Sequence, residues 1–387
     1  MRVLIAPDSF KGSASATAVA AALAAGWLAA RPDDQVTRLP LADGGEGTLD
    51  VLAATVPGAR WHRARVTGPT GAPVTARWLE LPAEPPSPGR PRPQRRGNGA
   101  PGPAGPVSTA AVEVARASGL ALLAHPDPLG AQTTGLGEIL GRALDAGAER
   151  VLVGLGGSAA TDGGTGALAA LGARFLDASG RPLPPGGGAL AALSRADLTH
   201  LRPPPVGRVT CLTDVTAPLL GPRGAAAVFG PQKGADGAQI ARLEAGLARL
   251  AEVLGGDPAA PGAGAAGGTG YGLATAWGAV LTPGAAELSR LAGLDRALAG
   301  TDLVITGEGR FDATSLTGKT CGAVIAAAAA AGVPVALVTG QVSGTAPGTA
   351  RVITLTGLAG STAAALASPR RWLRQAGRQL ARDGTRH

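Results

Sequence analysis

Acidic residues in this sequence recur in glycine-rich turns that directly follow short apolar runs. Asp8 follows "RVLI", Asp43 lies in "LADGGEGT", and Asp162 lies in "GGSAATDGG". Asp214 and Glu308 follow two further apolar runs, "RVTCL" and "DLVIT". Carboxylates in such turns are suited to holding Mg²⁺ or to accepting a hydroxyl proton. Glycines beside them let backbone N–H groups approach an anion closely. The combination is typical of a phosphoryl-transfer site.

Lysine is rare in this chain and always stands beside glycine. Lys and Arg together number 35, yet only Lys11, Lys233 and Lys319 are lysines. A compact ammonium group fits against a phosphate where the broad guanidinium fork does not. We interpret the three lysines as residues kept for chemistry, although solvated surface lysines remain the alternative.

Two nucleotide-binding motifs are nearly matched. The phosphate loop needs a glycine five residues before Gly318, and Ala313 stands there. The dinucleotide fingerprint is partly matched by Gly154, Gly156, Ala159 and Asp177. However, "TDGGTG" follows at once and interrupts the helix that the fingerprint requires. A nicotinamide-dependent oxidoreductase of a small hydroxy acid therefore stays open as an alternative, as does a non-catalytic small-molecule sensor.

Alternating strands and helices must position these residues. A strand at 2–5 is followed by an alanine-rich helix at 15–30 and a second apolar run within 36–45. The far end repeats this order with strands at 302–309, 333–340 and 351–357 and a helix at 320–331. The middle predicts a helix at 133–148 and strands at 150–157, 173–180 and 208–214. This order favours parallel sheets whose ligand crevices lie at the carboxyl ends of the strands.

The predicted fold is α/β with two domains. Residues 1–75 plus 285–387 should form a Rossmann-like parallel-sheet domain made from both chain ends, and residues 76–284 a second, inserted α/β domain. Segment 82–106 has nine prolines and five glycines, which predicts a disordered loop. Segment 369–387 has six arginines and is interpreted as a basic tail.

Charge and composition argue against several classes of protein. The net charge of +8 resides in segment 82–106 (+3) and segment 369–387 (+5), so the remainder is neutral. We see no aromatic stacking pattern beside the basic segments, which argues against nucleic-acid binding. Cys211 and Cys321 form neither a disulfide framework nor a metal quartet. The apolar run in "MRVLIA" is too short for a signal peptide, and no stretch predicts a membrane span, so we expect a cytoplasmic protein.

Seven stretches in order resemble the type I glycerate kinase family, which phosphorylates D-glycerate with ATP. They are "APDSFKGS", "PLADGGEGT", "TTGLGE", "GLGGSAATDGG", "TDVTAPLLG…FGPQKGA", "GAAGGTGYGL" and "DLVITGEGRFDATSLTGK", between residues 6 and 319. The resemblance implies two α/β domains with a substrate cleft between them. Two departures concern polar contacts: Ala160-Thr161 stand where the family usually has Thr-Asn, and Ala217-Pro218 where it has Asn-Pro.

The residue chemistry and the resemblance together predict a set of roles. We expect Asp43, in the same turn as Glu46, to accept the hydroxyl proton, and 2-phosphoglycerate to be favoured over 3-phosphoglycerate as the product. The expected cofactors are ATP and Mg²⁺, and a homo-oligomer is left open. The predicted catalytic residues are Asp43, Lys11, Lys319 and Asp162; the substrate-binding residues Asp8, Ser9, Arg310 and Lys233; the nucleotide-binding residues Gly44, Gly45, Gly47, Gly156, Gly157 and Ser158; and the metal ligands Asp214 and Glu308.

Overall fold

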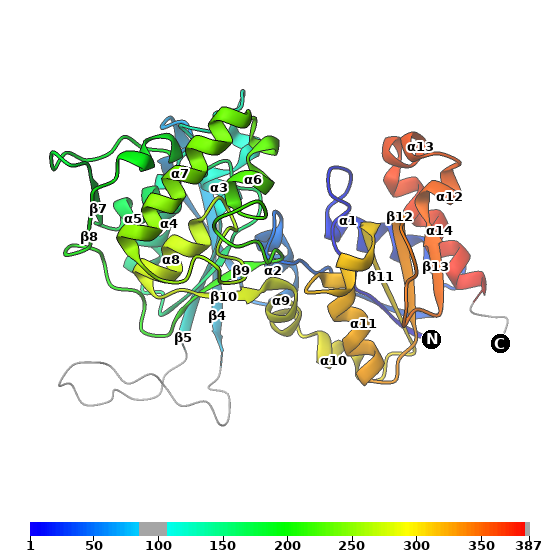
Figure 1. Cartoon of the computed structure of the whole chain (residues 1–387). Helices are drawn as coiled ribbons and strands as arrows, with labels where there is room; N and C mark the ends of the chain where they lie inside the picture. Colours follow the sequence, from blue (N-terminus) through cyan, green and yellow to red (C-terminus); the bar gives the residue numbers. More distant parts are fainter. Residues whose placement is uncertain (85–106, 384–387) are drawn as a thin grey trace. The chain divides into compact units, whose positions relative to one another are not determined.

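The computed structural model describes residues 1–84 and 107–383, which form two compact units (Figure 1). Unit 1 comprises residues 1–43, 50–57 and 283–387, and unit 2 comprises residues 44–49 and 58–282. Each unit contains a sheet and helices, which confirms the predicted α/β class and the assembly of one unit from both chain ends. The loop predicted at 82–106 lies outside the described residues from residue 85 on; residues 82–84 end a strand.

Unit 1 is built on a parallel sheet of five strands in the order β13-β12-β11-β1-β2. Val3 is paired with Leu303 on one side and Val36 on the other, so the two ends of the chain meet at the centre of the sheet. The carboxyl ends of these parallel strands share one edge. The strands are β1 (Arg2–Ile5), β2 (Gln35–Arg38), β11 (Leu303–Phe311), β12 (Val335–Val342) and β13 (Arg351–Thr354).

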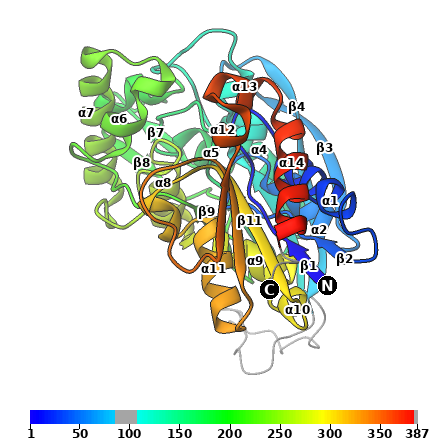
Figure 2. The ribbon, with the colours of Figure 1, turned by 90° about the vertical axis from the view of Figure 1, so that its right-hand side faces the viewer.

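Helices cover both faces of this sheet (Figure 2). Alternate strand residues point to opposite faces: Val3 and Ile5 belong to one buried cluster, and Leu4 and Val304 belong to another. The first cluster is closed by α1 (Ala16–Leu28), α12 (Leu355–Ala359), α13 (Thr362–Ala367) and α14 (Pro369–Asp383). The second is closed by α9 (Gly284–Ala292), α10 (Leu294–Leu298) and α11 (Thr320–Ala330). A 3₁₀ turn, η4 (Ala313–Leu316), links β11 to α11.

The prediction that residues 369–387 form a basic tail is wrong for residues 369–383. These residues form α14, a core helix that lies beside α1 (Figure 2). Leu373 and Leu380 are buried, whereas the arginines of α14 occupy its exposed face. The two helices approach so closely that a Cβ added at Gly377 would lie 2.3 Å from the carbonyl oxygen of Leu23. The composition of this segment is dominated by arginine and therefore suggested a tail. The helical spacing of its apolar residues is the feature that indicates a packed helix.

Unit 2 contains a sheet of six strands in the order β10-β9-β6-β5-β4-β3. Strand β4 pairs in antiparallel fashion with both β3 and β5, and β5, β6 and β9 are parallel. The predicted boundary at residue 75 assigned residues 60–67 to the first domain, whereas β3 pairs with β4 in this second sheet. The strands are β3 (Arg60–Thr67), β4 (Pro73–Glu84), β5 (Val107–Glu113), β6 (Arg150–Gly154), β9 (Val209–Thr213) and β10 (Val280–Pro283).

The helices of unit 2 enclose a single large core that includes Val112, Val153, Leu136 and Leu247. They are α3 (Val114–Ser118), η1 (Leu120–Leu122), α4 (Thr134–Asp145), α5 (Thr165–Ala170), η2 (Gly187–Ala192), α6 (Ala225–Phe229), η3 (Pro231–Lys233), α7 (Gly237–Leu254) and α8 (Thr269–Trp277). A small antiparallel pair, β7 (Arg174–Leu176) and β8 (Arg195–Asp197), lies beside them. The helix α2 (Thr48–Thr55) begins in unit 2 and ends in unit 1. Across residues 1–84 and 107–383, no helix combines the length and the apolar character needed to cross a membrane.

Candidate active site

Asp8 lies at the carboxyl edge of the sheet in unit 1, just after β1. Its backbone N–H donates to the carbonyl oxygen of Gly307 on β11 over 2.8 Å. Its carboxylate accepts a hydrogen bond from the hydroxyl of Thr320 over 2.8 Å and one from the N–H of Ser9 over 2.5 Å. Thr320 is the first residue of α11. The fold therefore joins the motif "APDSFKGS" to the residue that follows "DLVITGEGRFDATSLTGK", although the two are 312 residues apart.

Asp43 is the second carboxylate at this edge. The segment before it runs beside the exit of β1, since Leu41 N–H donates to the carbonyl oxygen of Pro7 over 2.9 Å. The Asp43 carboxylate is buried, and the ammonium group of Lys11 lies 3.9 Å from its Oδ2. The Lys11 side chain is itself 74% exposed. The Asp43 carboxylate is therefore buried next to the exposed ammonium group of Lys11, which is accessible to a ligand.

The Asp8 carboxyl group has a strongly perturbed acidity. Burial, and then the negative charge of Asp43, raise the pKa of Asp8 to about 7. The hydrogen bonds from Thr320 and Ser9 and the charge of Lys11 oppose this shift. A buried carboxyl group with a raised pKa can take part in acid–base chemistry near neutral pH.

This shift gives a testable pH dependence of stability. Between about pH 4 and pH 7 the folded state keeps the Asp8 proton while the unfolded state loses it, so the free energy of unfolding should fall as pH rises through this window. Urea unfolding of the wild type and of Asp8→Asn at intervals from pH 4 to pH 8 measures the difference. We expect the variant to lose that downward slope; parallel curves would contradict the assignment.

Lys319, Arg310 and Glu308 lie on or after β11 in the same unit. Lys319 precedes Thr320 and its ammonium donates to the hydroxyl of Thr314 over 3.0 Å. Arg310 is exposed, 4.0 Å from a carboxylate oxygen of Asp312. Burial raises the pKa of Glu308, and hydrogen bonds with Ser315 and Cys321, followed by the charge of Lys319, oppose that rise. Within the described part of the chain, Oε1 of Glu308 is buried and has no hydrogen-bond partner.

In unit 2 the two glycine turns predicted to bind nucleotide lie against each other. Gly156 N–H donates to the carbonyl oxygen of Gly44 over 3.4 Å, and a Cβ added at Gly156 would lie 2.4 Å from Cα of Gly45. Gly44 has a φ of 96°. Glycine is therefore required at these positions by backbone packing. Gly47 differs, since its φ is 91° and no described atom would lie within 4 Å of an added Cβ.

The second glycine turn, after β6, is held by hydrogen bonds to its backbone. Gly157 has a φ of 73°, and its carbonyl oxygen accepts from the N–H of Leu120 over 2.9 Å. The buried hydroxyl of Ser158 accepts a hydrogen bond from the N–H of Ala160 over 3.2 Å. These contacts give the turn a defined backbone.

Asp162 and Lys233 lie inside unit 2. The Asp162 side chain is fully buried and accepts hydrogen bonds from the N–H and hydroxyl of Thr133 and from the N–H groups of Gly164 and Gly166. The Lys233 ammonium donates to the carbonyl oxygen of Ala160 and the hydroxyl of Thr161. Burial raises the pKa of Asp162 and lowers that of Lys233 to about 8, against the charge of Asp162. In this structure both groups hold the loop after β6.

The predicted metal ligands belong to different units. Asp214 follows β9 in unit 2 and is half-buried, whereas Glu308 is on β11 in unit 1. In the part of the chain that the structure describes, no group of three His, Cys, Asp or Glu side chains is arranged to hold a metal ion. Mg²⁺ that arrives with a nucleotide needs only one or two carboxylates besides phosphate and water. The unpartnered oxygen of Glu308 fits that limited role.

Three polar residues that organise these turns were missed by sequence reasoning. Thr320 and Thr133 bind the carboxylates of Asp8 and Asp162. Thr133 stands inside the quoted motif "TTGLGE", and Thr320 directly follows the motif that ends at Lys319, so both positions carried a signal. Glu113, at the end of β5, stands in no glycine turn, and only the fold reveals its contacts.

The structure argues against the dinucleotide fingerprint. The loop after β6 continues through residue 164, and α5 begins only at Thr165, so no helix starts at the glycines. The acid expected to bind a ribose, Asp177, instead accepts hydrogen bonds from the N–H groups of Ser179 and Arg181 in an exposed turn. The oxidoreductase alternative therefore lacks its binding motif.

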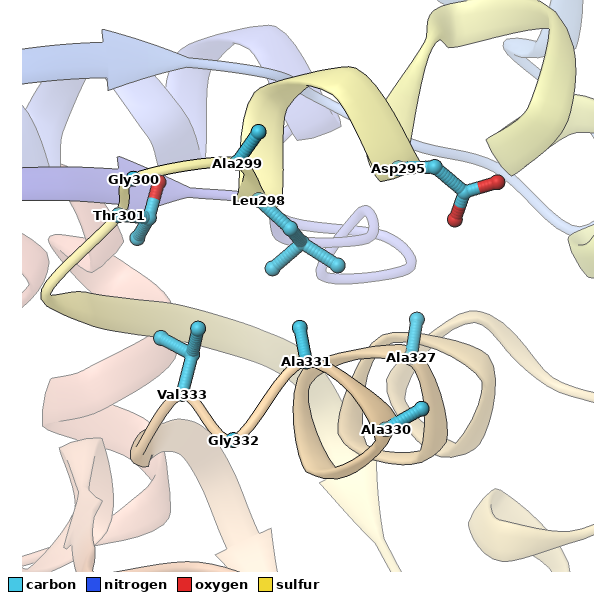
Figure 3. A pocket seen from close by; sticks show the side chains of 10 residues that line it. All are labelled: Asp295, Leu298, Ala299, Gly300, Thr301, Ala327, Ala330, Ala331, Gly332 and Val333. Carbon is cyan, nitrogen blue, oxygen red and sulfur yellow. The ribbon is translucent and has the colours of Figure 1, made fainter.

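A cavity of about 540 Å³ lies elsewhere in unit 1 (Figure 3). It is lined by α10, the residues after it and the end of α11, including Leu298, Thr301, Ala327 and Val333. Thr301 and Val333 precede β11 and β12, so the cavity is at the opposite edge of the sheet from Asp8. Its lining is mostly alanine, leucine and valine, with the carboxylate of Asp295 at one side (Figure 3). It contains none of the predicted site residues.

Comparisons with known proteins agree on one family. The sequence model of the glycerate kinase family matches residues 3–384. The chain is 41% identical to "Glycerate 2-kinase" of Escherichia coli (strain K12), covering 82% of this chain and 80% of that protein. It is also 41% identical to "Glycerate kinase" of Bacillus subtilis (strain 168), covering 89% and 86%. A crystal structure of a putative glycerate kinase 2 from Salmonella typhimurium LT2 matches with a TM-score of 0.79 and 37% identity, covering 100% of this chain and 98% of that one.

Proposed function

We propose that this phosphotransferase moves the γ-phosphoryl group of ATP to the 2-hydroxyl group of D-glycerate. The chain belongs to the glycerate kinase family, and the proposal proceeds from that membership. The observation that carries the chemistry is the buried pair Asp8 and Asp43 at the carboxyl edge of the sheet in unit 1. The Lys11 ammonium lies 3.9 Å from Asp43, and Lys319 directly precedes Thr320, which binds Asp8. Ligands of open parallel sheets bind at this edge.

Asp43 is proposed to receive the proton of the substrate hydroxyl as the new O–P bond forms. A positioned carboxylate performs this step efficiently only within hydrogen-bond reach of the hydroxyl. Asp8, whose pKa is about 7, holds a proton through much of the neutral range and can donate a hydrogen bond to the substrate. Ser9, next in the chain, is proposed to bind the same substrate.

The cations of unit 1 are proposed to neutralise the two anionic groups in the reaction. The ammonium groups of Lys11 and Lys319 suit the oxygens of the transferring phosphoryl group, which carry most of the charge. The exposed guanidinium of Arg310 suits a carboxylate such as that of glycerate, because it can form two parallel hydrogen bonds. Lys233 and Asp162 are proposed to act from within unit 2 by fixing the loop after β6.

The nucleotide is proposed to bind the glycine turns of unit 2. The open backbone around Gly47 leaves room for phosphate oxygens close to the main chain. Mg²⁺ would neutralise phosphate charge, with Glu308 or Asp214 as its protein ligand. The cytoplasmic location expected from the sequence belongs to this proposal as well.

A coupled assay of ADP release tests the proposed activity. Purified protein is given ATP and a panel of short hydroxy acids, with Mg²⁺ present or replaced by EDTA. We expect ADP release with D-glycerate and Mg²⁺ only. Change in NAD(P) absorbance without ADP would favour the oxidoreductase, and binding without turnover would favour a sensor.

The position of the new phosphate can be read from the product. In a proton-coupled ³¹P spectrum, phosphate on the 2-oxygen couples to one carbon-bound proton, whereas phosphate on the 3-oxygen couples to two. A doublet is the expected result. A triplet would assign the 3-hydroxyl as the acceptor.

Lys319→Arg tests whether the lysine contacts phosphate. The variant keeps the charge but replaces a compact ammonium by a planar fork, so the reacting groups should be misplaced. We expect kcat to fall roughly 10- to 100-fold with the fold intact. Steady-state kinetics with circular dichroism as the folding control measures this. Full activity would show that the lysine is at this position by chance.

A further inference from the structure

Glu113 occupies an unusual place for an acidic residue. It ends β5, pairs in register with Gly154 of β6, and is only 2% exposed. Buried carboxylates need hydrogen-bond partners to offset the loss of water. The identity of these partners indicates what Glu113 does.

One oxygen of Glu113 holds the start of α2. Its Oε1 accepts a hydrogen bond from the backbone N–H of Leu49 over 2.8 Å. Leu49 is in the first turn of α2, where N–H groups lack a partner within the helix and where a negative charge is favourable. Glu113 therefore caps a helix that is 64 residues away in sequence.

The other oxygen is held by Arg116. Its Nε donates to Oε2 of Glu113 over 2.9 Å, and its guanidinium carbon lies 5.2 Å from the ring centroid of Trp61. The carboxylate is thus oriented from both sides. A carboxylate fixed in this way can hold its hydrogen-bond partners in place.

The glycine turn that precedes Leu49 depends on this anchor. Thr48 donates its hydroxyl to the carbonyl oxygen of Gly45 over 2.8 Å, which ties the turn to the first residue of α2. At its other end, Gly44 and Gly45 pack on the strand end and turn at Gly154 and Gly156. Gly47, between these two attachments, has open space around it.

We infer that Glu113 is a positioning residue that fixes the turn at Gly45–Gly47 for a nucleoside triphosphate. This inference rests on the proposed function, because that function assigns the turn to the nucleotide. Glu113 acts through Leu49 and does not contact the phosphates itself. Its loss should weaken nucleotide binding more than it weakens binding of the hydroxy acid.

Glu113→Gln is the first test. The amide keeps an acceptor for Leu49 but places N–H groups against the guanidinium of Arg116, so the side chain must turn away. We expect the KM for ATP to rise roughly tenfold, the equivalent of one charge-assisted hydrogen bond, while the KM for D-glycerate changes less than about twofold. The Kd for ATP from calorimetry should rise by the same factor.

Glu138→Gln is the matched control. Glu138 also accepts a backbone N–H and a hydroxyl, both from Thr67, which lies in the same unit and outside the glycine turn. It should lose comparable stability and keep the wild-type KM for ATP. A rise in KM in both variants would mean a general loss of folding and would overturn the inference.

Two outcomes separate this inference from the proposed function. Folded Glu113→Gln with an unchanged KM for ATP overturns the inference only, whereas a wild-type protein that does not use ATP overturns both. The double variant Glu113→Gln/Arg116→Met removes the opposing guanidinium and should restore most of the affinity. If the single variant does not fold, the double variant carries the test, and a KM ten times the wild-type value there would contradict the inference.

Discussion

Asp43→Asn should lower kcat by about 10² to 10⁴ while leaving the fold and the affinity for ATP nearly intact. Asparagine keeps the shape of the side chain but cannot accept a proton. Asp43 is buried, 3.9 Å from the Lys11 ammonium, and its charge affects the proton affinity of Asp8. Steady-state kinetics with both substrates, together with calorimetric binding of ATP, measures the effect.

Comparison with Asp8→Asn shows which of the two carboxylates is the base. Burial raises the pKa of Asp8 to about 7, so Asp8 is the rival candidate for the base. If Asp43→Asn is fully active and Asp8→Asn loses rate by the same factor, the base is Asp8. Asp162 is a weaker rival, because its carboxylate is fully buried and holds four hydrogen bonds.

Truncation after Ser368 should prevent unit 1 from folding. Removing α14 exposes the apolar face of α1, including Leu23 and Trp27, and deletes the buried side chains of Leu373 and Leu380. Burial of each such leucine contributes about 1.5–3 kcal/mol, against a total stability of roughly 5–15 kcal/mol for a domain. We expect insoluble protein, or a product in which limited proteolysis degrades unit 1 first.

Two point variants test the contributions of the buried and the exposed face of α14 to stability. Gly377→Ala places a methyl group against the backbone of Leu23, so it should destabilise by about 1–3 kcal/mol. Arg378→Gln removes one charge from the exposed face and should change stability by less than about 0.5 kcal/mol. A soluble, active truncated protein would mean that α14 is dispensable.

The alternation of strands and helices could be predicted because its signals are local. The strand at 2–5, the helix at 320–331 and the strand at 150–157 each correspond to an observed element within a few residues. Apolar runs bounded by glycine identify strands, and an alanine-rich run identifies a helix, without reference to distant parts of the chain. The seven motifs then sufficed to indicate the family, which the comparisons confirm.

The α/β class, the family and the list of residues able to do chemistry could be read from the chain alone, because residue type and short spacing decide these. Which of those residues are neighbours and which are buried became known from the three-dimensional fold. Asp8 meets Thr320 across 312 residues, and Glu113 meets Leu49 across 64. The same packing encloses Asp162 and makes a core helix of an arginine-rich segment. Burial and hydrogen-bond partners depend on strand order and helix packing, which join segments whose separation no local pattern encodes.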